Sequence, residues 1–187
     1  MRALSNVDVT DFVNAMRREV QDAWERVDQI ALANQRKVLK AFHTHRISEY
    51  HFASGTGYGY NDAGRDALEA VYAQVFGAEA AFVRPLLASG THAISACLFG
   101  LLRPGDELLS ITGLPYDTMQ QVIGLVGDNP SSLIKWGVNY RYLPLKDGKI
   151  DVNATIGAIR PETKVVAIQR SRGYSWRPSL SVGEIGA

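Results

Sequence analysis

The stretch LASGTHAISACLFGLLRPGDELLSITGLPYDT, residues Leu87–Thr118, decides the fold. Its first part is apolar over the length of a short helix and begins at the small polar residues Ser89-Gly90-Thr91. A turn at Arg103-Pro104-Gly105-Asp106 follows, and then a short apolar run that is typical of a strand. A helix, a turn and a strand in this order form the basic unit of α/β proteins.

The same alternation continues on both sides of this stretch. Further helices are predicted at residues 64–76, 117–127 and 151–159, and further strands at residues 80–85, 138–145 and 164–170. Gly77 and Gly127 close two of these helices, and Asp117 is placed to cap one of them. Helices and strands that alternate at such lengths predict the α/β class, with a mostly parallel sheet covered by helices.

The N-terminal segment has a different pattern. Residues 8–42 predict one long amphipathic helix, with Asp8 or Thr10 as its cap. Apolar residues recur there at steps of three and four and form one stripe: Val9, Phe12, Val13, Met16, Val20, Trp24, Val27, Ala31, Val38 and Phe42. Such a stripe needs a surface to lie on, which its own domain or a second subunit would supply. We therefore expect a helical segment over residues 1–45 and a larger domain over residues 46–187.

Composition indicates a soluble protein. The 187 residues are 46% hydrophobic, and 20 Lys and Arg residues stand against 19 Asp and Glu residues. Without a basic excess, neither nucleic acid nor an acidic membrane is expected as the main partner, and no apolar run is long enough to span a bilayer. The single cysteine, Cys97, cannot form an internal disulfide and is expected to be a small core residue. A cytoplasmic location is therefore expected.

Ser89-Gly90-Thr91 is the first candidate binding site. The start of a helix exposes unpaired N–H groups and the positive end of the helix dipole, which together bind anions such as phosphate. Gly90 would let an anion approach the backbone closely, and the hydroxyls of Ser89 and Thr91 would add hydrogen bonds. The alternative is a capping turn, because Ser and Thr are preferred helix caps and Gly is common in turns. Taken alone, the motif fits a capping turn better.

Two tyrosine positions add to this motif. Tyr116 follows a predicted strand and should lie at the carboxyl edge of the parallel sheet, where ligands of α/β proteins bind. Its ring would either stack on a flat heteroaromatic ligand or pack on the next helix. Upstream, the glycine-rich stretch HFASGTGYGYN places Tyr58 and Tyr60 where they could donate to a phosphate. Gly55-Thr56-Gly57 in that stretch does not match the dinucleotide fingerprint, because no strand precedes it and the spacing differs.

In combination these elements are more specific. The stretch Leu87–Thr118 resembles the fold-type I pyridoxal-phosphate enzymes, especially their cysteine and methionine metabolism branch, through its Ser-Gly-x-x-Ala-Ile helix start, its Arg-Pro-Gly-Asp turn and its tyrosine. With residues 52–84 before it and 165–185 after it, the chain is most similar to the aluminium resistance protein family, which is methionine gamma-lyase-like and cystathionine beta-lyase-like. The resemblance covers nearly the whole chain from about Phe42 onward. It implies part of a three-layer, PLP-transferase-like large domain.

The resemblance implies a binding site for pyridoxal 5′-phosphate. The backbone N–H groups of Gly90 and Thr91, next to Ser89, would bind the cofactor phosphate. Tyr116 would stack on the pyridine ring and would also assist proton movement. The substrate implied is a small sulfur amino acid, and the reaction implied is the cleavage of a carbon–sulfur bond.

Other residues are expected at the rim of this site. Tyr58 matches a family loop tyrosine that reaches the cofactor of a neighbouring subunit, which implies a homodimer or homotetramer. The usual pattern at this loop is Tyr-x-Arg. Here it is Tyr58-Gly59-Tyr60, and Tyr60 would replace the hydrogen bond of that arginine but not its charge. Arg172 would meet a substrate carboxylate or a cofactor oxygen, unless it belongs to a basic surface loop. His43, His45 and His51 match no established zinc spacing, so no metal ligand is predicted.

The chemistry of the family also needs a lysine that forms a Schiff base with the cofactor and an acidic residue beside the pyridine nitrogen. In the family both follow the strand that comes after the segment matching residues 181–185. None of the six lysines stands in a matching context: Lys37, Lys40, Lys135, Lys146, Lys149 and Lys164. We therefore expect these residues to be the N-terminal portion of a carbon–sulfur lyase that is not catalytic alone. The alternative is a non-catalytic fragment or partner subunit of an assembly with this fold.

Overall fold

The computed structural model describes residues 8–55, 60 and 62–186. The chain divides into two compact units, residues 1–85 and residues 86–187. Within the described residues, no helix combines the length and the apolar character that crossing a membrane requires. The division expected near residue 45 stays a prediction.

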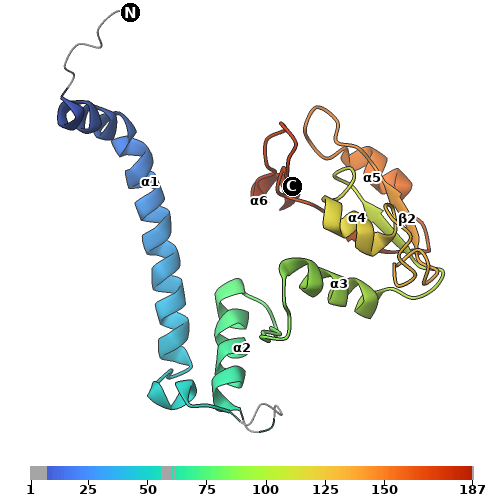
Figure 1. Cartoon of the computed structure of the whole chain (residues 1–187), viewed down its shortest axis with the longest axis horizontal. Coiled ribbons are helices and arrows are strands. Elements are labelled where there is room, and N and C mark those ends of the chain that lie inside the picture. The colour runs from blue at the N-terminus through green and yellow to red at the C-terminus, as the bar shows by residue number, and fades with distance from the viewer. Residues whose placement is uncertain (1–7, 56–59, 61, 187) are drawn as a thin grey trace, which may run out of the picture. The chain divides into compact units, whose positions relative to one another are not determined.

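The described part of the first unit contains the helices α1, η1 and α2 (Figure 1). Helix α1 spans Val9–Thr44 and begins at Asp8, whose carboxylate accepts a hydrogen bond from the backbone N–H of Thr10 at 2.8 Å. A short 3-10 helix, η1 (Glu49–Phe52), leads toward α2 (Ala63–Phe76), which packs against both α1 and η1. Gly77 ends α2 in the left-handed conformation, with a φ of 66°. The long helix, its Asp8 cap and the Gly77 stop are therefore as the sequence predicts.

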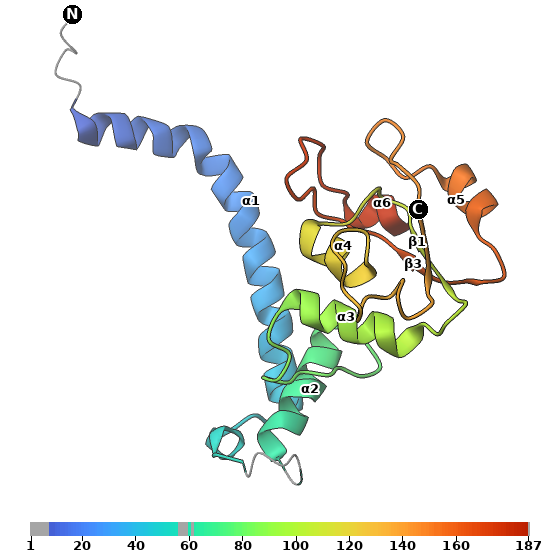
Figure 2. The ribbon, with the colours of Figure 1, turned by 45° about the vertical axis from the view of Figure 1, so that its right-hand side comes forward.

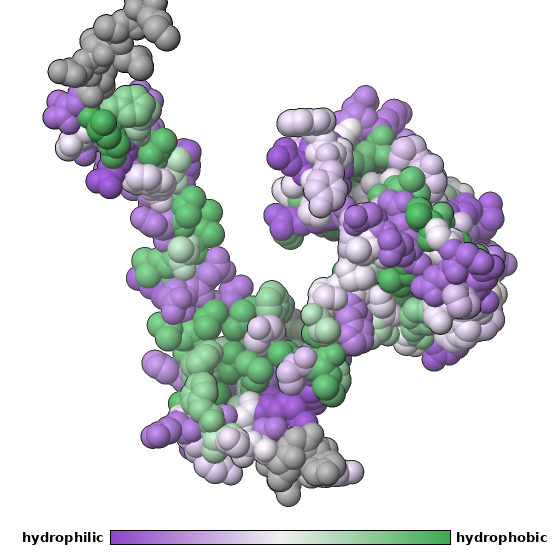
Figure 3. Space-filling view, viewed as in Figure 1, coloured by the Kyte–Doolittle hydropathy of each residue, from purple (hydrophilic) through white to green (hydrophobic). Residues whose placement is uncertain are grey.

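Most of the apolar stripe of α1 is exposed. Among the described residues, the only buried side chain of α1 is that of Ala41, which is not part of the stripe, whereas Phe12 and Trp24 of the stripe are 54% and 52% exposed. Figure 3 shows hydrophobic side chains along the length of this helix. The stripe predicted from the sequence is thus present, and within the described part of the first unit only its C-terminal end packs against another helix, α2.

The second unit is built on a three-stranded parallel sheet with the order β2-β1-β3. The strands are β1 (Glu107–Ser110), β2 (Asn139–Tyr142) and β3 (Thr163–Ala167). The helices are α3 (Gly90–Leu101), α4 (Asp117–Ile123), α5 (Val152–Ala158) and α6 (Val182–Gly186). A parallel sheet connected through helices confirms the α/β class.

The hydrophobic core lies between β1 and two helices. All four residues of β1 are buried because this strand is central in the sheet. Leu108 of β1 belongs to one buried cluster with Leu98 of α3 and Met119 of α4, and Figure 2 shows these two helices beside the sheet. The core cluster comprises Leu98, Leu102, Leu108, Met119, Ile123, Leu133 and Val138. This packing fixes the starts of α3 and α4 relative to the carboxyl end of the sheet.

An ion pair with a buried carboxylate links the three strands. Glu107 of β1 is only 3% exposed, and its carboxylate accepts hydrogen bonds from Arg141 of β2 and Thr163 of β3. The distances are 2.7 Å from Arg141 Nη2 and 2.5 Å from Thr163 Oγ1. The hydrogen bond from Arg141 lowers the pKa of Glu107 from 4.5 to about 2, against the opposing effect of burial.

Four local predictions are wrong. No strand forms at residues 80–85. Glu69 accepts hydrogen bonds from the Val83 backbone N–H and the Arg84 guanidinium, so the Val83 N–H does not bond to a neighbouring strand. Helix α4 ends at Ile123, before the predicted residue 127, because Gly124 takes a φ of 96°. Asp117, the predicted cap of this helix, is its first residue instead, and Tyr116 occupies the cap position. Cys97 is exposed and is not part of the hydrophobic core cluster.

Candidate functional site

A cavity opens at the carboxyl ends of β1 and β3 in the second unit. Its volume is about 520 Å³, which is within the usual range for small-molecule sites. Its lining comes from both strand ends, from α3 and from the start of α4, and includes Ile94, Ser110, Tyr116, Ala167, Gln169 and Arg170. In sheets of this type ligands bind at the carboxyl ends of the strands. The cavity is therefore the candidate functional site.

Helix α3 begins beside this site with a polar turn. The Ser89 hydroxyl caps the helix and accepts a hydrogen bond from the backbone N–H of His92 at 3.1 Å. The backbone N–H groups of Gly90 and Thr91 have no acceptor among the described residues. A side chain added at Gly90 would meet open space. The turn is thus a helix cap that also leaves two N–H donors and space for an anion.

Tyr116 connects the starts of the two helices. Its hydroxyl lies 3.1 Å from the Thr91 hydroxyl, and the Thr91 hydroxyl lies 3.2 Å from that of Thr118 in the first turn of α4. The Tyr116 ring is half-buried and packs against the core cluster. The structure therefore brings Ser89, Gly90, Thr91 and Tyr116 to one place, although 25 residues separate Thr91 from Tyr116.

Gln169 is a site residue that the sequence analysis missed. Its side-chain oxygen accepts a hydrogen bond from the backbone N–H of Tyr116 at 3.0 Å, and the backbone N–H of Gln169 donates to Thr112 Oγ1 at 2.9 Å. The available signal was its position, since it is the first polar residue after the apolar run of β3. Thr118 was missed as well, because nothing in its sequence context distinguishes it.

Three other residues were predicted for the site: Tyr58, Tyr60 and Arg172. Tyr58 lies outside the described residues. Tyr60 belongs to the first unit and is 81% exposed. Arg172 is exposed, and Arg170 instead lines the cavity. The roles given to Tyr58, Tyr60 and Arg172 stay predictions.

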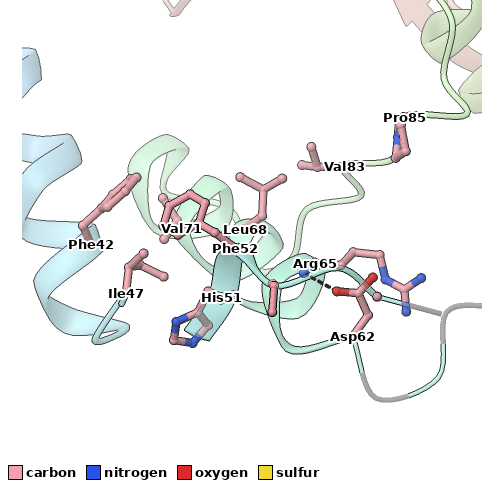
Figure 4. Close-up of a pocket in the computed structure, with 14 residues that line it drawn as sticks. Phe42, Ile47, His51, Phe52, Asp62, Arg65, Leu68, Val71, Val83 and Pro85 are labelled. Atoms are coloured by element: carbon pink, nitrogen blue, oxygen red, sulfur yellow. Dashed lines mark hydrogen bonds between the residues drawn. The ribbon is translucent and has the colours of Figure 1, made fainter. Parts of the chain in front are cut away.

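A second cavity of about 340 Å³ lies within the first unit (Figure 4). Apolar side chains form most of its wall, among them Phe42, Phe52, Leu68 and Val71. The dashed line in Figure 4 marks the hydrogen bond that Asp62 accepts from the Arg65 backbone N–H at 3.1 Å, by which Asp62 caps α2. Over residues 8–55, 60 and 62–186, no three His, Cys, Asp or Glu side chains gather in a way that could hold a metal ion.

Comparison with known proteins gives consistent results. A family model described as methionine gamma-lyase matches residues 9–187. The Bacillus subtilis protein YnbB is 52% identical over 163 residues, which are 86% of this chain and 39% of that protein. A Listeria innocua structure titled "putative cystathionine beta-lyase involved in aluminum resistance" is 46% identical with a TM-score of 0.90, over 96% of this chain and 44% of the other. A Clostridium novyi carbon–sulfur lyase involved in aluminum resistance is 44% identical with a TM-score of 0.87, over 95% of this chain and 43% of the other. This chain therefore spans less than half the length of these relatives.

Proposed function

This chain belongs to the methionine gamma-lyase family, and from that premise we propose that it supplies the phosphate-binding and ring-stacking residues of a pyridoxal-phosphate-dependent carbon–sulfur lyase. The substrate would be a sulfur amino acid of the cystathionine or methionine type. The Listeria innocua relative is described as a putative cystathionine beta-lyase and the Clostridium novyi relative as a carbon–sulfur lyase, and they share the fold at TM-scores of 0.90 and 0.87. The family and the fold predicted from the sequence are thereby confirmed, whereas the reaction and its substrate are our proposal.

One observation carries this proposal. The start of α3 and the cap of α4 are joined by the Thr91–Tyr116 hydroxyl contact of 3.1 Å, at the edge of the sheet where the cavity opens. A phosphate-binding helix start and an aromatic ring beside it are the two features that a phosphorylated heteroaromatic cofactor requires. A plain capping turn would not need the tyrosine at this position.

The residues present fit the phosphate of such a cofactor. Gly90 and Thr91 offer two backbone N–H donors at the positive end of a 12-residue helix. Gly90 has no side chain to block the approach, and the space in front of it is open. The Ser89 hydroxyl already accepts the bond from His92, so it stabilises the helix start and keeps its own proton for donation.

The residues near Tyr116 fit the ring of the cofactor. The tyrosine ring packs on the core on one part of its surface and lines the cavity with another. The hydroxyl contact with Thr91 holds the ring in one orientation, and the same hydroxyl is placed to accept or donate a proton within the cavity. When bound, pyridoxal phosphate supplies an electron sink for the carbanion formed at the substrate alpha carbon.

The lysine that would form the Schiff base with the cofactor does not line this cavity. None of the six lysines of the chain lines the cavity. We propose that this lysine and the acidic partner of the pyridine nitrogen belong to the part of the relatives' length that this chain does not span. We also propose a cytoplasmic homodimer or homotetramer, in which the loop with Tyr58 and Tyr60 contacts the cofactor of a neighbouring subunit and Arg172 contacts an oxygen of substrate or cofactor.

An activity assay with a matched pair of variants tests the function. The protein at its full natural length would be incubated with pyridoxal phosphate and a series of sulfur amino acids, and the released thiol would be measured. In Gly90→Val a side chain fills the space in front of the phosphate donors, so the apparent affinity for the cofactor should fall roughly ten- to a hundredfold, the worth of one charge-assisted hydrogen bond. Gly100→Val is the control, because Gly100 also faces open space but lies at the other end of α3. Thiol release that is absent from every substrate, or equal loss of cofactor affinity in both variants, would refute the proposal.

A further inference from the structure

We propose that Gln169 is the positioning residue of the cofactor site, holding Tyr116 in place from the end of β3. The inference rests on the proposed function, because it assigns a role to Gln169 within that same site. The structure supplies the argument through four hydrogen bonds that converge on this one residue.

The first bond fixes the backbone of Tyr116. The Tyr116 N–H donates to Gln169 Oε1 at 3.0 Å across 53 residues of sequence. Because Tyr116 is the cap residue of α4, its own N–H has no acceptor inside the helix. The preceding residue, Pro115, has no N–H at all, so the bond to Gln169 is the one that a backbone N–H of Pro115-Tyr116 donates.

Gln169 is itself held in a single orientation. Its backbone N–H donates to the hydroxyl of the buried Thr112 at 2.9 Å, which joins it to the segment after β1. Its side-chain nitrogen donates to the Ser171 carbonyl at 3.3 Å, and its own carbonyl accepts from the Arg177 guanidinium at 3.1 Å. The amide group is therefore turned so that its oxygen faces Tyr116.

The chemistry of the side chain matches this task. An amide presents an acceptor oxygen and a donor nitrogen, and both atoms are used here, the oxygen toward Tyr116 and the nitrogen toward Ser171. A carboxylate would keep the acceptor but would lack the donor, whereas an apolar side chain would lack both. Gln169 lines the cavity and is absent from the hydrophobic core cluster, so its effect on the site is separable from an effect on the core.

Two measurements test the inference. The first is the hydrogen exchange of the Tyr116 amide in the protein without cofactor, with the Leu108 amide as an internal reference for the fold. Gln169→Leu should lower the protection of the Tyr116 amide against hydrogen exchange roughly three- to tenfold, which corresponds to the loss of one neutral hydrogen bond. Gln169→Glu should retain that protection, because its carboxylate still accepts from Tyr116. Equal protection in the wild type and Gln169→Leu would overturn the inference.

The second measurement is the affinity for pyridoxal phosphate in a double-mutant cycle. Gln169→Leu should weaken binding roughly three- to tenfold in the wild-type background. It should have no further effect in the Tyr116→Ala background, because a positioning residue acts only through the residue that it positions. Additive losses would mean that Gln169 contacts the cofactor directly and would overturn the inference. If the wild-type protein binds no pyridoxal phosphate, the proposed function fails and the inference fails with it. If the wild-type protein binds pyridoxal phosphate and Gln169→Leu binds it equally well, the inference alone fails.

Discussion

Replacing Glu107 with glutamine should destabilise the second unit in a strongly pH-dependent way. The carboxylate is 3% exposed and lies among Arg141 of β2, Thr163 of β3 and its own strand β1. Glutamine has nearly the same size and still accepts hydrogen bonds, so the substitution removes mainly the charge. The experiment therefore isolates what the ionised pair contributes to the stability of the sheet.

The magnitude follows from the pKa of Glu107. Pairing with Arg141 lowers this pKa from 4.5 to about 2. At about 1.4 kcal/mol for each unit of pKa, this difference in pKa corresponds to about 3 kcal/mol of stability at neutral pH. Because the folded-state pKa is the lower one, the contribution is complete above about pH 4.5 and is lost as the pH falls toward about 2. The wild type and Glu107→Gln should therefore converge in stability across this interval.

Urea unfolding followed by circular dichroism, repeated from neutral pH down through this interval, would measure the effect. Asp128→Asn is the control, because Asp128 pairs with Lys135 at 3.1 Å with side chains that are 90% and 57% exposed. Solvent screens such a pair, so the control should change little at any pH. A loss in Glu107→Gln no larger than in the control, or one that stays constant as the pH falls, would refute the reasoning.

Three further predictions concern single side chains. Tyr116→Phe removes the hydroxyl contact with Thr91, so stability should change little while the affinity for pyridoxal phosphate falls roughly three- to tenfold, as measured by calorimetric titration; unchanged affinity would contradict the role of the hydroxyl. Ser89→Ala removes the cap of α3 and should cost about 1 kcal/mol in urea unfolding, whereas a neutral result would show that the cap contributes nothing. Leu102→Ala opens a cavity at a fully buried position and should cost about 2–5 kcal/mol, and a loss below about 1 kcal/mol would mean that this core is loosely packed.

Local patterns in the sequence predicted most of the second unit. The apolar residues after Arg103-Pro104-Gly105-Asp106 form β1, because a central parallel strand needs little more than continuous apolar residues. The β-branched run in residues 164–170 forms the edge strand β3, because β-branched residues favour extended backbone. The caps at Asp8 and Ser89 were predictable for the same reason, since each depends on residues within one helical turn.

Features that depend on distant partners were not predictable in this way. Residues 80–85 have the composition of a strand, but Glu69 takes up the Val83 N–H, so no strand pairing forms there. The bond between Tyr116 and Gln169 joins residues 53 positions apart, and no local pattern marks it. The ion pair of Glu107 likewise became visible only once the register placed Arg141 and Thr163 beside it.

The central claim is that this protein binds pyridoxal phosphate at the starts of α3 and α4 and uses it on a sulfur amino acid. The most direct test is the visible absorbance spectrum of the protein at its full natural length, recorded with pyridoxal phosphate before and after a sulfur amino acid is added. We predict a band of protein-bound cofactor that shifts when the amino acid is added and that weakens in Gly90→Val but not in Gly100→Val. A spectrum identical to that of free pyridoxal phosphate, with no change on adding any sulfur amino acid, would contradict the claim.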